Sequence, residues 1–343
     1  MIKNCIIRVL AALVIYTTPS FALEVVDTKL ARSWPIKPSD TTDGSRQESW
    51  ANVSYVVNTQ GKIEQIEVLS HSDVVFDSDY LARLLQAREY EPAYIDNKPV
   101  PSAKNDIVFM EKLFNGFDND TIKRGFMRLA HEFSDAITRK DMDSAQQKLA
   151  ELREYTKNNT EQALSHWYNS QYYFFKQDWQ QYQHHLLSAF ALQKKLPTEF
   201  RIDLLQNTVS WFMYTHEYAN ALGAIDAYRS LVDVNMDAAV VKEAMAQVVS
   251  TLEQHSHITY QYTMAPSEAR LVAMSRERTV ISTQAPLSKA QLRCNYAVID
   301  IPMNEQGEYD ITQLSSRGQC AFLLRSDIRQ KVKIVQSGHS HLL

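Results

Sequence analysis

Glycine is scarce in this sequence, with only 8 residues among 343. Glycine-rich loops that cradle nucleotide phosphates need that residue, so the composition argues against this kind of nucleotide site. An excess of charge of one sign is also lacking, because the net charge is only -4. Surfaces that bind nucleic acid or anionic membranes normally carry a basic excess, and we therefore expect no nucleic-acid partner. The length allows two or three domains.

Long hydrophobic runs are missing as well, and the longest apolar stretch near the N-terminus has the form of an export signal. Lys3 and Arg8 flank its start, residues 6–16 are apolar, and Ser20-Phe21-Ala22 offers small residues to a signal peptidase. The apolar stretch is shorter than the roughly 20 residues of a membrane span. We expect residues 1–22 to be a signal peptide cleaved after Ala22. The alternative is an anchor that stays in the inner membrane with the chain facing the periplasm.

Cysteine is nearly absent too, and its placement matters. Of the three cysteines, Cys5 precedes the apolar run and would be lost with the leader. The mature chain would then hold Cys294 and Cys320, and two cysteines in an exported protein most simply form a disulfide.

The clearest positive pattern lies in residues 49–101. Val53, Tyr55 and Val57 alternate with their neighbours as in a strand, and Gly61 closes a polar turn. Apolar positions then indicate a second strand (Ile63, Ile66, Val68), a helix (Phe76, Tyr80, Leu81, Leu84, Leu85) and a last strand (Ile107, Val108, Phe109). The predicted order is strand, strand, helix, strand. Residues 23–48 before it are polar and turn-rich, which indicates a linker.

The sequence of this segment resembles the C-terminal domain of the TonB energy-transducer family. The residues that carry the resemblance are Trp50, Val68-Leu69-Ser70, Phe76-Asp77, Tyr90-Glu91-Pro92-Ala93 and Asn97-Lys98-Pro99-Val100. The resemblance covers about a fifth of the chain and implies a small β-β-α-β domain over residues 49–112 in the periplasm. It also implies docking of extended periplasmic segments of outer-membrane transporters by strand addition. We expect Ile107, Val108 and Phe109 to form the partner-binding edge; the alternative is that the helices that follow cover this edge.

The chain departs from an energy transducer in its N-terminal part. The apolar leader is short and carries no histidine, and residues 23–48 replace the long proline-rich spacer of that family. Even fully extended at about 3.3 Å per residue, that segment is too short to cross much of the periplasm. We therefore expect binding without force transmission, although a retained N-terminal segment would leave a membrane-anchored transducer as an alternative.

Residues 115–255 have helical periodicity and an internal repeat. A polar turn followed by an aromatic residue or methionine recurs at Met142, Trp179 and Tyr218, in steps of 37 and 39 residues. This spacing is similar to that of tetratricopeptide hairpins, which stack because no single hairpin can bury its apolar face. The middle hairpin is rich in aromatic residues, from Trp167 to Tyr182. They either pack between helices or line a surface that receives a peptide.

Residues 257–343 are short strand-like runs broken by turns, such as the turn at residues 304–307. They indicate a β-rich module that the predicted disulfide would clamp. The whole chain is thus expected to be a multidomain α+β protein.

Catalytic and metal-binding patterns are not convincing. His131-Glu132 and His216-Glu217 begin like metalloprotease motifs but lack the second histidine, and the neighbours His184 and His185 point apart on a helix. We expect no enzyme, no cofactor, no metal and no small-molecule substrate. The sequence indicates a periplasmic protein-interaction protein with envelope partners, linked to TonB-dependent transport by the resemblance alone. The alternative is a scaffold or assembly factor whose helical repeats hold the partner.

Overall fold

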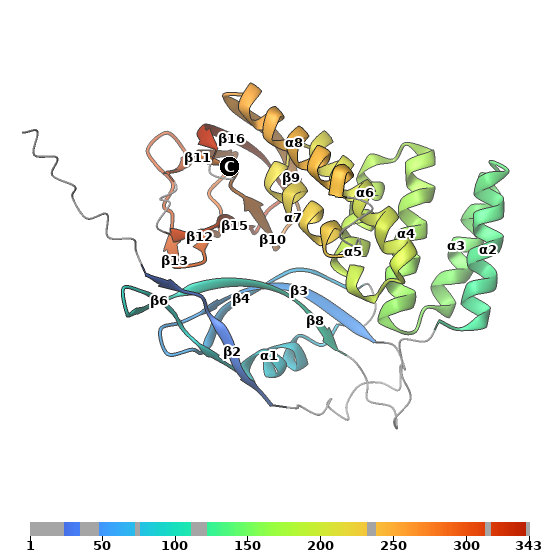
Figure 1. Ribbon diagram of the computed structural model, residues 1–343, viewed down its shortest axis with the longest axis horizontal. Coiled ribbons are helices and arrows are strands. Elements are labelled where there is room, and N and C mark those ends of the chain that lie inside the picture. Colours follow the sequence, from blue (N-terminus) through green and yellow to red (C-terminus); the bar gives the residue numbers. More distant parts are fainter. Residues whose placement is uncertain are drawn as a thin grey trace, which may run out of the picture.

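The computed structural model describes residues 24–34, 48–72, 76–110, 122–231, 238–312 and 317–340. Helices and small antiparallel sheets both occur, so the chain is mixed α+β, as the sequence predicts. Three parts follow one another: a three-stranded sheet with one helix, a block of helices, and a pair of four-stranded sheets (Figure 1). The predicted cleavage site at Ala22 lies outside the described residues.

The first sheet contains the predicted order of strand, strand, helix and strand. Its elements are β3 (Ser49–Val57), β4 (Ile63–His71), α1 (Ser78–Gln86) and β8 (Ser102–Met110), and the strands are antiparallel in the order β4-β3-β8. Gly61 adopts φ +77 in the turn between β3 and β4, where any Cβ would collide with the carbonyl oxygen of Tyr90. The carboxylate of Asp77 caps α1 by accepting from the backbone N–H of Tyr80.

One interpretation of a neighbouring segment was wrong. Residues 23–48 were expected to be a linker, but they include β1 (Val25–Val26) and β2 (Lys29–Ser33). The helix α1 ends at Gln86. Short strands follow it: β5 (Arg88–Glu91), β6 (Ala93–Ile95) and β7 (Lys98–Val100). The strand β2 pairs with β5, and β1 pairs with β6. All side chains of β1 and β2 are exposed. Their sequences therefore lack the alternation of apolar and polar residues by which a half-buried strand is recognised.

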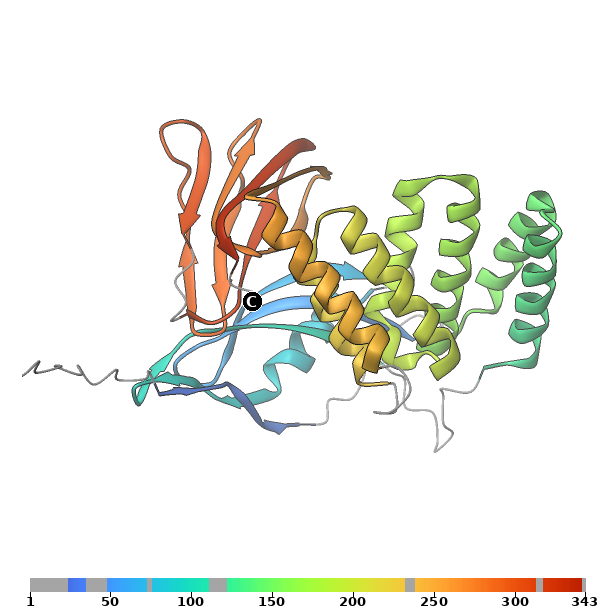
Figure 2. The same ribbon diagram turned by 45° about the horizontal axis from the view of Figure 1, so that its top comes forward.

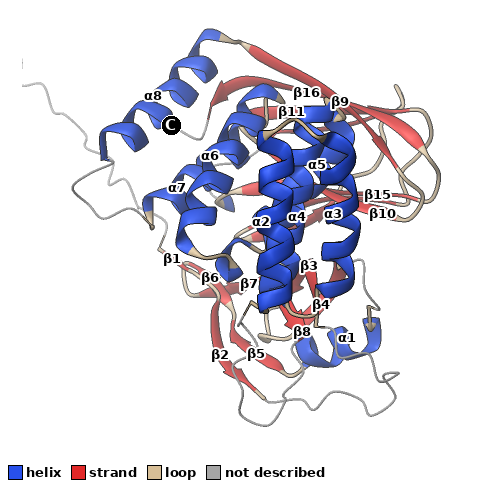
Figure 3. Cartoon of the chain, turned by 90° about the vertical axis from the view of Figure 1, so that its right-hand side faces the viewer, coloured by secondary structure: helices blue, strands red, loops and turns tan. Residues whose placement is uncertain are grey.

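The helices form antiparallel hairpins (Figure 3). In chain order they are α2 (Arg124–Thr138), α3 (Met142–Tyr155), α4 (Asn159–Lys176), α5 (Trp179–Ala191), the short η1 (Gln193–Lys195), α6 (Thr198–Tyr214), α7 (Tyr218–Arg229) and α8 (Ala238–Gln254). The helices α3, α5 and α7 begin at the three positions that the repeat predicts. The fourth residue of each is buried, and it is alanine in α3 and α7 but Tyr182 in α5. The bulky tyrosine shows that the three hairpins pack with different side chains.

The C-terminal part is two antiparallel sheets packed face to face. Its strands are β9 (His257–Met264), β10 (Glu268–Ala273), β11 (Arg276–Thr283), β12 (Lys289–Cys294), β13 (Ala297–Asp300), β14 (Glu308–Thr312), β15 (Cys320–Ser326) and β16 (Gln330–Ser340). One sheet has the order β10-β15-β12-β13 and the other β14-β11-β16-β9. Side chains from both sheets, such as Phe322 and Ile334, share one buried core. The predicted turn at residues 304–307 is present and leads into β14.

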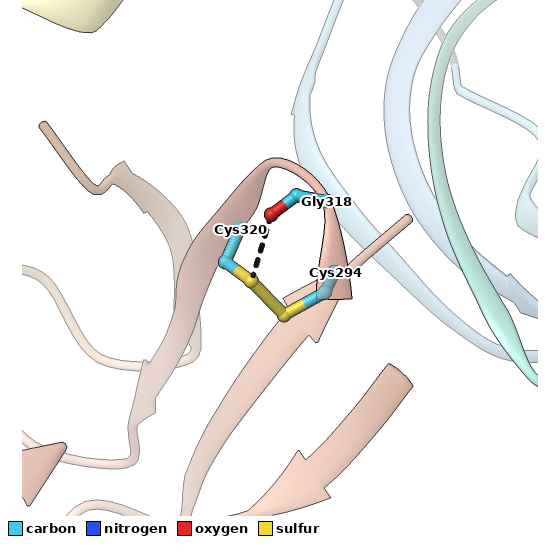
Figure 4. Close-up of a disulfide and its surroundings, with 3 residues drawn as sticks. All are labelled: Cys294, Gly318 and Cys320. Carbon is cyan, nitrogen blue, oxygen red and sulfur yellow. Dashed lines mark hydrogen bonds between the residues drawn. A yellow bond between two sulfur atoms is a disulfide. The ribbon is translucent and has the colours of Figure 1, made fainter. Parts of the chain in front are cut away.

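The predicted disulfide is confirmed. Cys294 and Cys320 are bonded and lie directly opposite each other on β12 and β15, with their Cα atoms 4.0 Å apart (Figure 4). Both residues are buried.

The first sheet lies beneath both of the other parts (Figures 1 and 2). Val53, Tyr55 and Val57 point to the α1 side and form a core with that helix. Trp50 points to the opposite side and is fully buried in the core of the helical block. Both faces of the sheet are therefore used inside the molecule, which leaves its edges as the parts available to another chain.

Candidate partner-binding surfaces

The strand β8 forms a regular edge of the first sheet. It pairs with β3 over nine consecutive residues without any irregularity, and among the described strands it pairs with β3 alone. The opposite edge strand, β4, has two irregularities in its pairing, and Gln65 within it adopts φ +50. Bulges twist an edge and discourage further pairing. Of the two edges, β8 is thus the one suited to accept another strand.

The predicted binding residues pack on both faces of β8, with Val108 buried and Ile107 and Phe109 half-buried. Val108 is buried in the core beside α1, while Ile107 and Phe109 pack against the helical core on the other face. The ammonium of Lys195 lies 5.1 Å from the centre of the Phe109 ring. The helical block therefore covers one face of β8. The strand therefore presents its backbone at the edge, and its side chains pack on both faces of the sheet.

Two polar pairs border the same strand. The guanidinium of Arg88 contacts the carboxylate of Asp106 at 2.5 Å, and the hydroxyls of Tyr55 and Tyr90 share a hydrogen bond of 2.7 Å. Burial, with the Tyr90 hydroxyl as a further cause, raises the pKa of Tyr55, so that its phenol stays neutral. The strand β13 approaches β8 without pairing with it. A chain added at this edge would meet these groups.

A buried polar joint fixes the C-terminal sheets on the first sheet. Arg293 donates to the hydroxyl of Ser54 at 2.7 Å and to the carbonyl oxygen of Gln65 at 2.8 Å. The carboxylate of Glu67 accepts from Lys289 at 2.9 Å. Burial lowers the pKa of Arg293 to about 10, although Glu67 and Asp300 oppose that shift. Arg293 therefore stays charged at neutral pH, and its donors are engaged within the chain.

His166 lies in a buried contact between the first sheet and the helices. The Nδ1 atoms of His166 and His185 are 3.0 Å apart, and the ring of Trp50 meets His166 edge-on. Burial lowers the pKa of His166 to about 3, with His184 as a smaller cause. Within the described residues, no group of three or more histidine, cysteine, aspartate or glutamate side chains is placed to hold a metal ion.

The two histidine–glutamate pairs are also explained by local contacts. Glu132 contacts Arg128 and Lys148, which lie on α2 and α3. Glu217 accepts from Thr215 and Asn220 at the start of α7. A small pocket lies between this turn and β9 and β10, lined among others by Arg270 and Tyr260, and it has room for little more than water. Both carboxylates thus serve the packing of helices.

A second surface is made of aromatic rings at one end of the helical block. We call the following six residues the aromatic surface: Phe174, Phe175, Trp179, Tyr182, Trp211 and Tyr214. They come from the end of α4, the start of α5 and the end of α6. Within the predicted cluster, Trp167, Tyr168, Tyr172 and Tyr182 are buried, whereas Phe174, Phe175 and Trp179 are exposed. The packing interpretation is confirmed for the buried rings, and a role of the exposed rings in receiving a peptide stays a prediction. Sequence reasoning missed Trp211 and Tyr214, which stand one repeat later, before the next polar turn.

Comparison with known proteins identifies no family for this chain. No family model matches the chain, and a search of curated proteins finds no match. Among the helices in the described ranges, none is both long and apolar enough to cross a bilayer. The two surfaces described above therefore carry the functional argument.

Proposed function

We propose that this chain is a periplasmic protein-interaction protein whose first sheet is a TonB-like docking domain. An extended segment of an envelope partner adds to the sheet as a new strand beside β8. Periplasmic segments of outer-membrane transporters are the partner class that the family resemblance implies. The observation that carries the proposal is the regular edge of β8, which has nine unbroken pairs on one side and no strand partner among the described residues on the other.

The anchoring of β8 supports this mode of binding. In strand addition, backbone hydrogen bonds supply the affinity, so the receiving strand must hold its N–H and C=O groups in fixed positions. Val108 is anchored on one face and Phe109 on the other, which fixes the strand. Binding then costs little ordering on this side of the interface.

The bordering charges suggest how partners are selected. Asp106 of β8 and Arg88 of β5 form an ion pair beside the edge, and Lys104 and Asn105 precede Asp106 on β8. Alternate side chains of an added strand would lie next to these groups. We therefore expect polar residues at alternate positions of the partner segment.

A proline scan of β8 tests this function in the full chain. Amides of neighbouring strand residues point alternately toward β3 and away from it, so one of Lys104 and Asn105 directs its N–H outward. Proline at the outward position removes one donor to the partner and leaves the pairing with β3 intact. Lys104→Pro and Asn105→Pro are compared by the anisotropy of labelled peptides from the periplasmic N-termini of outer-membrane transporters.

One of the two proline variants is expected to keep its melting temperature and lose about tenfold in affinity, the value of roughly one hydrogen bond. The other is expected to lose stability, because it breaks a bond to β3. The matched controls Lys104→Ala and Asn105→Ala keep the backbone donors and should bind like the unaltered chain. Unchanged binding in both proline variants, or failure of every transporter peptide to bind, contradicts the proposal.

A further inference from the structure

The strand β9 is a sheet edge without charged side chains. An edge strand presents unpaired backbone groups, and charged residues, prolines or bulges usually keep other chains from pairing with it. Among the described edge strands of four or more residues, β2, β4, β5, β8, β10, β13 and β14 each contain aspartate, glutamate, lysine or arginine. The strand β9 contains none of these residues and no proline. Its edge therefore lacks protection by side chains.

The backbone of β9 is regular as well. It pairs with β16 over eight consecutive residues without a bulge, and among the described strands it pairs with β16 alone. Outside that pairing, β9 makes no backbone–backbone hydrogen bond with the described part of the chain. Figure 3 shows β9 leading from the end of α8 along the upper border of the molecule. A row of backbone N–H and C=O groups is thus left for a further strand.

The side chains of β9 alternate between the interior and the solvent. Ile258 and Met264 are buried, and they hold the strand on the cores of the helical block and of the C-terminal sheets. On the other face, Thr259, Gln261 and Thr263 are exposed. This exposed row is polar but uncharged, so it would lie beside an added strand without repelling it.

The strand is complementary to a second copy of itself. Two antiparallel copies related by a two-fold axis at Gln261 bring the two Gln261 side chains together and place Thr259 opposite Thr263 of the second copy. Threonine pairs and glutamine pairs across strands are favourable, and no like charges meet. The edge of β8 differs, because Lys104 and Asp106 on it would select a partner by charge. The uncharged edge of β9 favours an identical strand.

We propose that the chain forms a homodimer in which two β9 strands pair antiparallel about Gln261. The sheet β14-β11-β16-β9 of one copy then continues into the same sheet of the other. A two-fold pairing uses the β9 edge of both copies, so assembly stops at the dimer. One pair of strands is a small interface, and we expect a dissociation constant of about 1 to 100 µM. Dimerisation does not depend on strand addition at β8.

Sedimentation velocity at about 1 to 200 µM protein tests the proposal, because this range brackets the expected dissociation constant. The sample is residues 23–343, which contain every described element. Gln261→Lys puts two like charges at the two-fold axis and is expected to weaken dimerisation at least about tenfold. Thr312→Lys is the matched control, since it puts the same charge on an exposed residue of β14, at the opposite edge of the same sheet.

Disulfide trapping supplies a readout that does not rely on repulsion. Residues opposite each other in antiparallel strands have Cα atoms about 4.5–5.5 Å apart, which is within reach of a disulfide. Mild oxidation should therefore link two copies of Gln261→Cys, whereas Thr312→Cys should stay unlinked. The native cysteines Cys294 and Cys320 are already bonded to each other and do not compete.

The results separate a β9 dimer from other states of the chain. Circular dichroism checks that the variants fold. A monomer at every concentration, a dimer that Gln261→Lys weakens no more than Thr312→Lys does, or no linked dimer of Gln261→Cys each overturns the proposal. Gln261→Lys should leave the binding of transporter peptides unchanged, so failure of this proposal and failure of the proposed function at β8 are distinguishable.

Discussion

Trp50 shows how single residues join the parts of this molecule. It belongs to a strand of the first sheet, yet its side chain is fully buried among helices and meets His166 edge-on with ring centres 6.5 Å apart. The sequence places Trp50 at the start of a strand, but the side of the sheet on which it packs depends on residues more than 100 positions later. Such long-range contacts cannot be read from local periodicity.

His166 makes stability depend on pH in the acidic range. Its pKa is about 3 in the folded chain, against an ordinary value near 6.5, so the unfolded chain binds one more proton between these values. Above about pH 6.5 the imidazole is neutral in both states, and it does not change the free energy of unfolding. As the pH falls from 6.5 toward 3, protonation of the unfolded chain lowers the free energy of unfolding by roughly 1.4 kcal/mol per pH unit. His166→Gln should therefore reduce the slope of unfolding free energy against pH by roughly 1.4 kcal/mol per pH unit, the value for one bound proton.

Urea unfolding at several pH values between 4 and 7 measures the slope. His131→Gln is the control, because His131 is exposed on α2. If His166→Gln and the unaltered chain lose stability in parallel as the pH falls, the buried neutral histidine is not the cause of the acid sensitivity.

At the scale of elements, strands with buried side chains were predictable and exposed strands were not. The strands β3, β4 and β8 have alternating or largely apolar residues because they contribute side chains to a core. The exposed strands β1 and β2 are held by backbone pairing, which any sequence can supply, so composition gives no sign of them.

The candidate surfaces were predictable to the same extent. The sequence identifies β8 as the last strand of its sheet, and hence as an edge under the expected topology. It does not show that Ile107 and Phe109 face the helices, since that depends on how the helical block docks. Trp179 of the aromatic surface was singled out from the sequence, but only the packing of α5 against α6 brings Trp211 and its neighbour Tyr214 next to Tyr182.

The disulfide is an element-scale clamp between β12 and β15. It closes a loop with a sequence separation of 26 and lies within the C-terminal core. The double variant Cys294→Ala/Cys320→Ala should lose about 3 kcal/mol of unfolding free energy, mainly because the unfolded chain regains freedom. Thermal unfolding with and without a thiol reductant checks this: the reductant should lower the melting temperature of the unaltered chain only. An equal effect of reductant on the variant would point to some other reducible group.

At the scale of the whole molecule, the first sheet connects the other two parts. Trp50 ties it to the helices, and Arg293 ties it to the C-terminal sheets through Ser54 and Gln65. A fragment that contains the sheet alone would expose Trp50 and leave Ser54 without this partner. Function is therefore best tested with point variants of the full chain.

Arg293→Met removes the polar joint while keeping much of the side-chain volume. The carbonyl oxygen of Gln65 would lose this donor, and Gln291 would lose its contact with Arg293. We expect a loss of about 3 kcal/mol in unfolding free energy. The control Arg329→Met changes an exposed arginine and should cost less than about 0.5 kcal/mol. Equal effects of the two substitutions in urea unfolding would show that the joint contributes no specific stability.

The central claim is that β8 receives an extended partner segment through its backbone. Residue-resolved hydrogen exchange of the full chain, with and without a transporter peptide, tests it most directly. Strand addition predicts slower exchange at every second amide of residues 102–110, with no change in α4 to α6. Protection confined to α4, α5 and α6, or no change along β8 when the peptide is bound, would contradict the claim.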